Sequence, residues 1–184
     1  MIAYLFWHCA YPTTTAEQYE EALMRFQQRL GQQQPPGFGG SASFRVAALP
    51  WLGNRPGYED WCLLDGSWAL DPLNSFAVAG PVVGAHDAAA TQMDEGYGGL
   101  YALVWGEPVL PKQSTAVWLT RPRGIQWRTT LDAPQLPGTG GRWCSDPARS
   151  SLSSCRRVSM SPHQQASRRW PSSACASMRP LIRD

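Results

Sequence analysis

The spacing of hydrophobic residues changes several times along the first hundred residues, and each spacing predicts a different element. Residues 2–9 (IAYLFWHC) hold no strand-breaking residue before Pro12, so they predict a β-strand. Alternate side chains of a strand share a face, which places Tyr4, Phe6 and His8 together. Because both faces are largely apolar, we expect this strand to lie at the centre of its sheet, covered on each side.

A helix is predicted after the strand. Thr15 and Gln18 stand at the spacing of a capping box, in which each side chain bonds the backbone N–H of the other residue. Apolar residues then recur at intervals of three and four, the period of one helix face. Gly31 is expected to end the helix. The face expected to be buried consists of Tyr19, Ala22, Leu23, Phe26 and Leu30.

Two more strands and a second helical region follow. Residues 41–49 alternate between apolar and polar positions, which predicts a half-exposed strand, and residues 58–64 predict a third strand. Asp71 and Pro72 suit a helix cap followed by the first helical residue. A second helical piece is expected over residues 85–95.

A glycine-rich stretch precedes the last predicted strand of this region. Gly96, Gly98 and Gly99 are expected to break the helix before a fourth strand over residues 99–105. The resulting order, β-α-β-β-α-β, is typical of a ferredoxin-like α+β domain with a four-stranded antiparallel sheet. We assign this domain to residues 1–106.

The rest of the chain predicts less regular structure. Residues 107–133 hold an extra strand and the start of a second unit, and residues 134–184 are expected to be an irregular or disordered tail. Residues 145–184 carry seven arginines and two aspartates, whereas residues 1–144 carry nine basic and twelve acidic residues. A basic tail suggests nucleic acid as a partner, but its many serines and prolines suit a disordered segment.

We favour a third explanation, in which the tail is translated out of frame. Lysine occurs once, at Lys112, against fifteen arginines, which indicates GC-rich coding DNA. A shifted frame of such DNA yields the arginine, serine, proline, alanine and cysteine that follow Trp143. We therefore expect the protein from its native source to differ in intact mass from 20.3 kDa and to give peptides of the shifted frame. An intact mass of 20.3 kDa would contradict this hypothesis.

Composition narrows the class of protein. No apolar run approaches the roughly 18 residues that a membrane span needs, and residues 2–7 lack the flanks of a signal peptide. Five cysteines without a Cys-x-x-Cys pair agree with a reducing, cytoplasmic compartment. His8, His86 and His163 have no partner three or four residues away, so no metal site is expected. Nine tryptophans predict aromatic side chains lining a core, a cavity or an interface.

The opening aromatic strand, the helix after it, and the helix around AHDAAATQM with its glycine-rich turn resemble the dimeric α+β-barrel superfamily. The resemblance covers residues 1–106. It implies a homodimer that pairs two sheets, and a ligand cavity between each sheet and its helices. Because that superfamily includes small antibiotic-biosynthesis-type monooxygenases and haem-binding chlorite dismutase relatives, the resemblance implies several functions rather than one.

Two histidines are weak candidates for catalysis. His8 ends the first strand and can serve as a general base or a polar anchor at the mouth of a cavity. The alternative is a strand-end histidine that is exposed or bonded to a neighbouring backbone. At His86, the resemblance to haem proteins that use a helical histidine implies an iron ligand, and the alternative is a histidine on the helix surface. We favour the alternative for both and expect no cofactor.

Two further groups carry charge beside tryptophan. Glu59 and Asp60 next to Trp61 suit a base of raised pKa, but we expect them on a solvated strand face or at an interface. A basic cluster suits an anionic substrate tail, and the alternative is ion pairing across an interface. The net negative charge of residues 1–144 argues against a nucleic-acid surface. The cluster consists of Arg121, Arg123, Trp127 and Arg128.

The leading hypothesis is a binding or accessory module that holds a small apolar or aromatic ligand. Aromatic residues are abundant and no catalytic motif is present, so we expect Tyr4, Phe6, His8 and Trp61 to line its cavity. The alternative is a cofactor-independent monooxygenase or isomerase with His8 or His86 as base, or a haem protein. Neither nucleic acid nor a membrane is expected as a partner.

Overall fold

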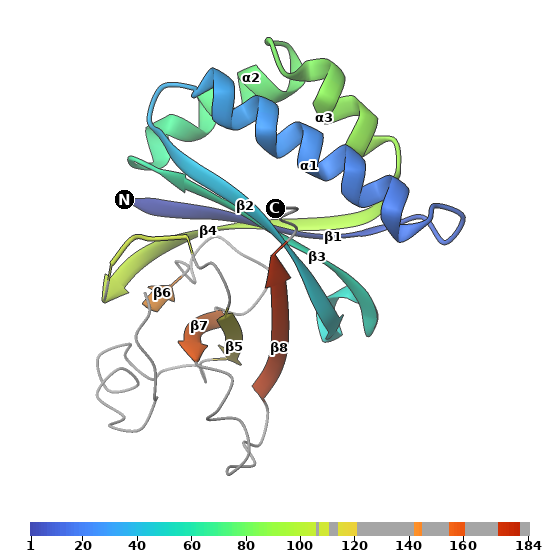
Figure 1. The fold of residues 1–184 in the computed structure, drawn as a ribbon. Coiled ribbons are helices and arrows are strands. Elements are labelled where there is room, and N and C mark those ends of the chain that lie inside the picture. Colours follow the sequence, from blue (N-terminus) through green and yellow to red (C-terminus); the bar gives the residue numbers. More distant parts are fainter. Residues whose placement is uncertain (106, 111–113, 121–141, 145–154, 161–172, 181–184) are drawn as a thin grey trace.

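Two layers, one of strands and one of helices, make up the first hundred residues of the computed structural model. Four antiparallel strands lie in the order β2-β3-β1-β4, and all three helices cover one face of this sheet (Figure 1). This is the ferredoxin-like α+β arrangement that the hydrophobic pattern predicts. The structure describes residues 1–105, 107–110, 114–120, 142–144, 155–160 and 173–180. The elements of this region are β1 (Ile2–Ala10), α1 (Ala16–Gln33), β2 (Phe38–Leu49), β3 (Arg55–Leu64), α2 (Leu70–Val78), α3 (Val83–Ala90) and β4 (Met93–Trp105).

Strand β1 is central, as its two apolar faces predict. It pairs with β3 on one side and with β4 on the other. Phe6 lies opposite Asp60 of β3, and His8 lies opposite Tyr58. Because directly opposed residues of an antiparallel pair share a face, this register brings Asp60 to the same face as Phe6 and His8.

The first helix begins where the sequence predicts and ends later. Thr15 and Gln18 form both hydrogen bonds of the capping box. The prediction that Gly31 ends the helix is wrong, because α1 continues to Gln33 and a left-handed Gln34 follows it. The N–H of Gln34 still bonds the carbonyl oxygen of Leu30. A glycine inside a helix costs only about 1 kcal/mol, which these closing contacts outweigh.

The second helical region is shorter than predicted. Helix α2 begins at Leu70, so Asp71 lies in its first turn rather than at its cap. Helix α3 ends at Ala90, and β4 already begins at Met93. The expectation that helix extends over residues 85–95 is therefore wrong at its end, and the glycines that follow belong to a strand.

Gly96 and Gly98 lie inside β4 because aromatic side chains of β1 cross over them. A Cβ atom at Gly98 would lie 2.6 Å from the Tyr4 hydroxyl, and a Cβ atom at Gly96 would overlap the ring of Phe6. Glycine in a strand often marks such a close approach. These glycines therefore make room for two rings on the helix-facing side of the sheet.

The opposite face of the sheet carries the largest buried side chains, including Trp7 and Trp61. Both indole N–H groups donate to the carboxylate of Glu59, at 2.9 Å from Trp7 and 2.5 Å from Trp61. Glu59 is fully buried, and Asp60 and Trp61 are 9% and 1% exposed. The expectation of a solvated face for Glu59 and Asp60 is therefore wrong, because β3 is covered on both of its faces.

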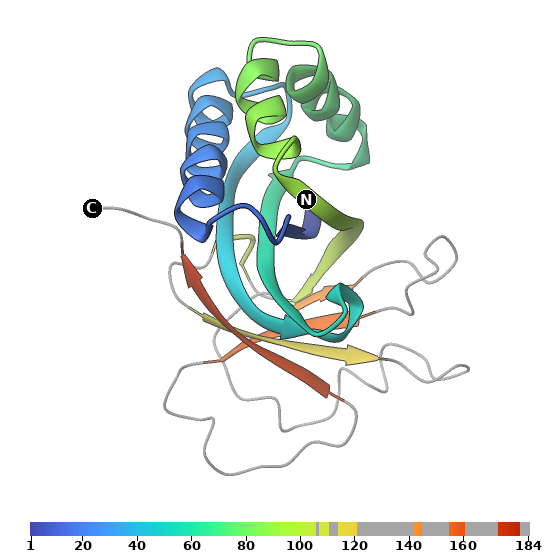
Figure 2. The same cartoon turned by 90° about the vertical axis from the view of Figure 1, so that its right-hand side faces the viewer.

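Beyond Trp105, the described residues form four further strands, which continue the sheet on the side away from the helices (Figures 1 and 2). β8 pairs with β2 and β6 pairs with β4, which closes an eight-stranded barrel. Around the barrel, the first four strands follow one another as β4-β1-β3-β2 and the later four as β8-β5-β7-β6. In both series the last strand of the chain order comes first, and the first, third and second strands follow it. They are β5 (Ser114–Thr120), β6 (Arg142–Cys144), β7 (Cys155–Met160) and β8 (Ser173–Pro180).

The boundaries at 106/107 and 133/134 stay predictions, as does the reading frame after Trp143, which concerns the coding DNA. Among the described residues, no helix combines the length and the apolar character needed to cross a membrane.

Candidate functional site

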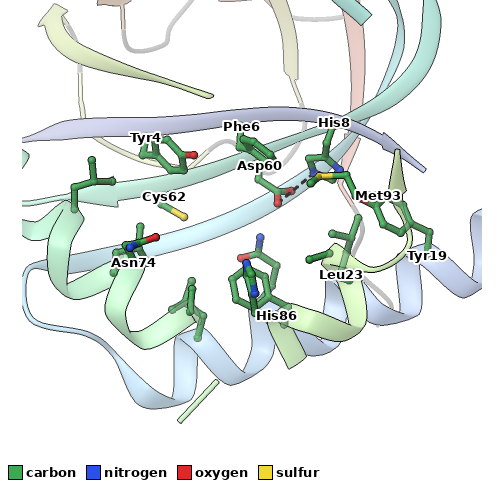
Figure 3. Close-up of a pocket in the computed structure, with 18 of the residues that line it drawn as sticks. Tyr4, Phe6, His8, Tyr19, Leu23, Asp60, Cys62, Asn74, His86 and Met93 are labelled. Carbon is green, nitrogen blue, oxygen red and sulfur yellow. Dashed lines mark hydrogen bonds and ion pairs between the residues drawn. The ribbon is translucent and has the colours of Figure 1, made fainter. Parts of the chain in front are cut away.

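A cavity of about 440 Å³ lies between the sheet and the three helices (Figure 3). Side chains of β1 and β3 form its floor, and side chains of α1, α2 and α3 form its roof. Most of these side chains are apolar, with a few polar groups among them. The floor consists of Tyr4, Phe6, His8, Asp60 and Cys62, and the roof includes Tyr19, Leu23, Phe26, Gln27, Leu73, Asn74 and His86.

A row of stacked rings runs along the floor. The ring centroids of Tyr4 and Phe6 lie 6.4 Å apart, and those of Phe6 and His8 lie 5.3 Å apart. Tyr58 continues the row, 5.7 Å from His8. These residues meet because alternate side chains of one strand share a face and cross-strand partners lie beside them. The predicted grouping of Tyr4, Phe6 and His8 on one face is therefore confirmed.

Trp61 does not line this cavity. It lies on the opposite face of β3, packed in the cluster that contains Trp7 and Phe44. Its neighbours Asp60 and Cys62 line the cavity in its place.

His8 is a buried histidine held between two polar side chains. Its Nδ1 lies 2.7 Å from the Tyr19 hydroxyl, and its Nε2 lies 3.3 Å from Oδ2 of Asp60. Burial and the nearby Asp60 raise the pKa of Tyr19 well above its usual range, so Tyr19 keeps its proton. The direction of the hydrogen bond between this hydroxyl and Nδ1 depends on the ring tautomer, and a proton on Nε2 would face Asp60. The opposite tautomer would set a lone pair against the carboxylate.

Two acceptor oxygens beside the cavity have no hydrogen-bond partner among the described residues. They are Oδ1 of Asp60 and Oε1 of Gln27. The Gln27 amide donates to Oγ of Ser43 at 2.8 Å, and Ser43 lies directly opposite Asp60 in the sheet. A buried acceptor without a partner costs free energy, so both oxygens suit a donor group supplied by a ligand.

The ionisable groups around the cavity are acids, histidines, a thiol and phenols. None of its described lining residues is an arginine or a lysine, whereas Asp60 and Asp71 both contribute carboxylates. Burial, and next the charge of Asp60, raise the pKa of the Cys62 thiol, so Cys62 stays protonated. Burial also raises the pKa of Tyr4. The formal charge of the cavity lining is therefore negative when both histidines are neutral.

His86 enters the same cavity from α3 and faces the floor that carries Asp60 (Figure 3). Its Nδ1 lies 3.0 Å from Oδ1 of Asp87, and its ring packs against Phe26. The residues do not fit haem, because the described lining offers carboxylates and neither arginine nor lysine to pair with the propionates. Within the described part of the chain, no group of three metal-ligating side chains is found.

Sequence reasoning missed the role of Tyr19. It was expected only as part of the buried helix face, and nothing in the spacing of residues places its hydroxyl on His8. Arg121, Arg123, Trp127 and Arg128 lie outside the described residues, so their expected role in ligand binding stays a prediction.

No protein-family model matches this chain, and a search of curated proteins found no match either. The likeness to the dimeric α+β-barrel superfamily over residues 1–106 therefore rests on sequence pattern alone, and the role of the cavity is argued from its residues.

Proposed function

We propose that this protein binds a small, largely apolar aromatic molecule in the cavity between its sheet and its helices. The observation that supports this most is the pairing of an aromatic floor with the unpartnered acceptor oxygens of Asp60 and Gln27 in the same lining. Ligand sites are generally apolar hollows of about 300–1,000 Å³ with a few polar groups that fix orientation. A cavity of about 440 Å³ suits a ligand of one or two rings.

A thermal-shift screen of aromatic compounds tests this proposal. A ligand at about 100 times its Kd stabilises the folded protein by about 2.7 kcal/mol, which corresponds to a rise in Tm of about 5–10 °C. We expect at least one compound to give such a rise. The same compound should lose its effect on the variant Ala90→Phe, because Ala90 lines the cavity and a phenyl group would fill it.

Val78→Phe is the matched control. Val78 is exposed on α2 and does not line the cavity, so this variant should keep the full rise in Tm. If no compound raises the Tm, or if Ala90→Phe responds as the unchanged protein does, the cavity is not the binding site.

A second candidate function, isomerisation by proton transfer, is favoured by the contact between His8 and Asp60. In such a reaction the carboxylate of Asp60 takes a proton from one ligand carbon, exchanges it with solvent and delivers a proton to another carbon, so no co-reactant is consumed. A ligand from the screen, incubated with the protein in D₂O, would then gain deuterium with the unchanged protein and none with His8→Ala or Asp60→Asn. A lack of deuterium uptake with the unchanged protein removes this candidate and leaves the binding proposal intact.

Two expectations from the sequence accompany the proposal. Pairing of two copies as a homodimer and a cytoplasmic location both stay predictions.

A further inference from the structure

We propose that the preferred ligand is a cationic aryl-alkylamine, with its ammonium group at Asp60 and its ring against Tyr4 and Phe6. This inference rests on the proposed function and names the chemical class that the cavity takes. An aromatic ring on a short alkyl chain with a protonated primary amine matches both ends of the site.

The acceptors at the polar end match the donors of an ammonium group. Asp60 is 9% exposed, and its Oδ1 has no hydrogen-bond partner among the described residues. Oε1 of Gln27 is a second such acceptor of the same cavity lining, and the Gln27 amide donates to Ser43, the cross-strand neighbour of Asp60. An ammonium group has three donors and no acceptor. It therefore has enough donors for both oxygens, which a ligand with a single donor does not.

The charge of the lining favours a cation over an anion. Asp60 is the buried carboxylate of the described lining, and no described lining residue is an arginine or a lysine. A carboxylate or phosphate ligand would lie beside Asp60 without a cation to pair with it, and unpaired buried charge is costly. His8 lies against Oδ2 of Asp60, which leaves Oδ1 for the ligand.

The aromatic floor suits the rest of such a molecule. Tyr4 and Phe6 present stacked rings on the cavity side of β1, beside the position of Asp60 (Figure 3). Aromatic pairs contribute beyond the area they bury, and ring faces also attract cations. A phenyl ring on a two-carbon chain would contact these rings while its amine reaches the carboxylate.

Isothermal titration calorimetry at pH 7 with three probes of nearly equal shape tests the inference. The probes are 2-phenylethylamine, 2-phenylethanol and phenylacetate. A hydrogen bond to a charged group contributes more than a neutral one, so we expect the amine to bind about tenfold or more tightly than the alcohol. The carboxylate should bind more weakly than either.

Variants assign the preference to named side chains. Asp60→Asn keeps the shape and removes the charge, so it should abolish the advantage of the amine while changing alcohol binding by less than about threefold. Gln27→Met removes the second acceptor and should weaken amine binding to a smaller extent, and it serves as the second test if Asp60→Asn does not fold. Asp71→Asn, at an exposed position of the lining, is the matched control and should keep the preference.

The outcomes separate this inference from the proposed function. If the alcohol or the carboxylate binds as tightly as the amine, the amine preference is wrong and the binding proposal stands. The same holds if Asp60→Asn keeps the full preference. If none of the probes binds and no compound of the wider screen raises the Tm, the proposed function fails and this inference fails with it.

Discussion

Replacing Gly57 with alanine is expected to lower the free energy of unfolding by about 3 kcal/mol, at the upper end of what overpacking costs. Gly57 is buried in β3, and a Cβ atom there would lie 2.5 Å from the carbonyl oxygen of His8 and 2.8 Å from Cδ1 of Leu52. The His8 backbone cannot move away freely, because β1 is held by β3 on one side and by β4 on the other. Chemical denaturation with urea measures the loss.

Gly31→Ala is the matched control for this change. Gly31 lies inside α1 with nothing within 4 Å of the position that a Cβ atom would take. Alanine is favoured over glycine in a helix by about 1 kcal/mol, so this variant should gain stability.

If Gly57→Ala loses less than about 1 kcal/mol, β1 and β3 separate more easily at His8 than the structure implies. Because a shift of the His8 backbone would move its ring relative to Tyr19 and Asp60, Gly57→Ala should also weaken ligand binding.

The folded protein is expected to lose stability steeply above about pH 9 to 10. Burial raises the pKa of Tyr19 above its ordinary value of 10.0 and that of Cys62 above 9.0. The folded state therefore keeps protons that the unfolded state releases. Each group contributes its full stabilisation at a pH below its ordinary pKa, and this contribution is lost as the pH rises above that value. Each group contributes a slope that approaches about 1.4 kcal/mol per pH unit. Urea denaturation at a series of pH values from 7 to 11.5 measures this slope.

Tyr19→Phe separates the contribution of the tyrosine. At pH 7 this variant loses the hydrogen bond to His8 and should be less stable by about 1 kcal/mol. Above pH 10 its stability should fall more slowly than that of the unchanged protein. Equal slopes for the two proteins would show that Tyr19 ionises in the folded state as easily as in the unfolded one.

Much of the candidate site follows from alternation along one strand. Because side chains of a strand alternate, Tyr4, Phe6 and His8 had to share a face, and each lines the cavity. The same rule placed Asp60 on the face opposite to Glu59 and Trp61. It did not show which face of β3 meets which face of β1, since that depends on the register between the two strands. Trp61 was consequently expected in the cavity, and Asp60 on a solvated face.

The predicted starts and ends of helices were right or wrong for a similar reason. The capping box at Thr15 and Gln18 is a contact between residues three apart, so the sequence alone identified it. The glycines at 96 and 98 were expected to end a helix, because glycine weakens regular structure locally. In the folded protein they belong to β4, where the rings of Tyr4 and Phe6 need their space. That requirement comes from residues of β1 that lie ninety or more positions earlier in the chain.

The sequence by itself determined the order of elements, the faces of β1, the start of α1 and the choice of a ferredoxin-like α+β class, because these depend on neighbours within a few residues. Only the tertiary structure decided which polar groups meet. The contact of Tyr19 with His8, the approach of Asp60 to the same ring and the position of Gln27 over Ser43 each join different elements. Burial then decides their chemistry, since it keeps the phenol protonated and leaves acceptor oxygens for a ligand to satisfy.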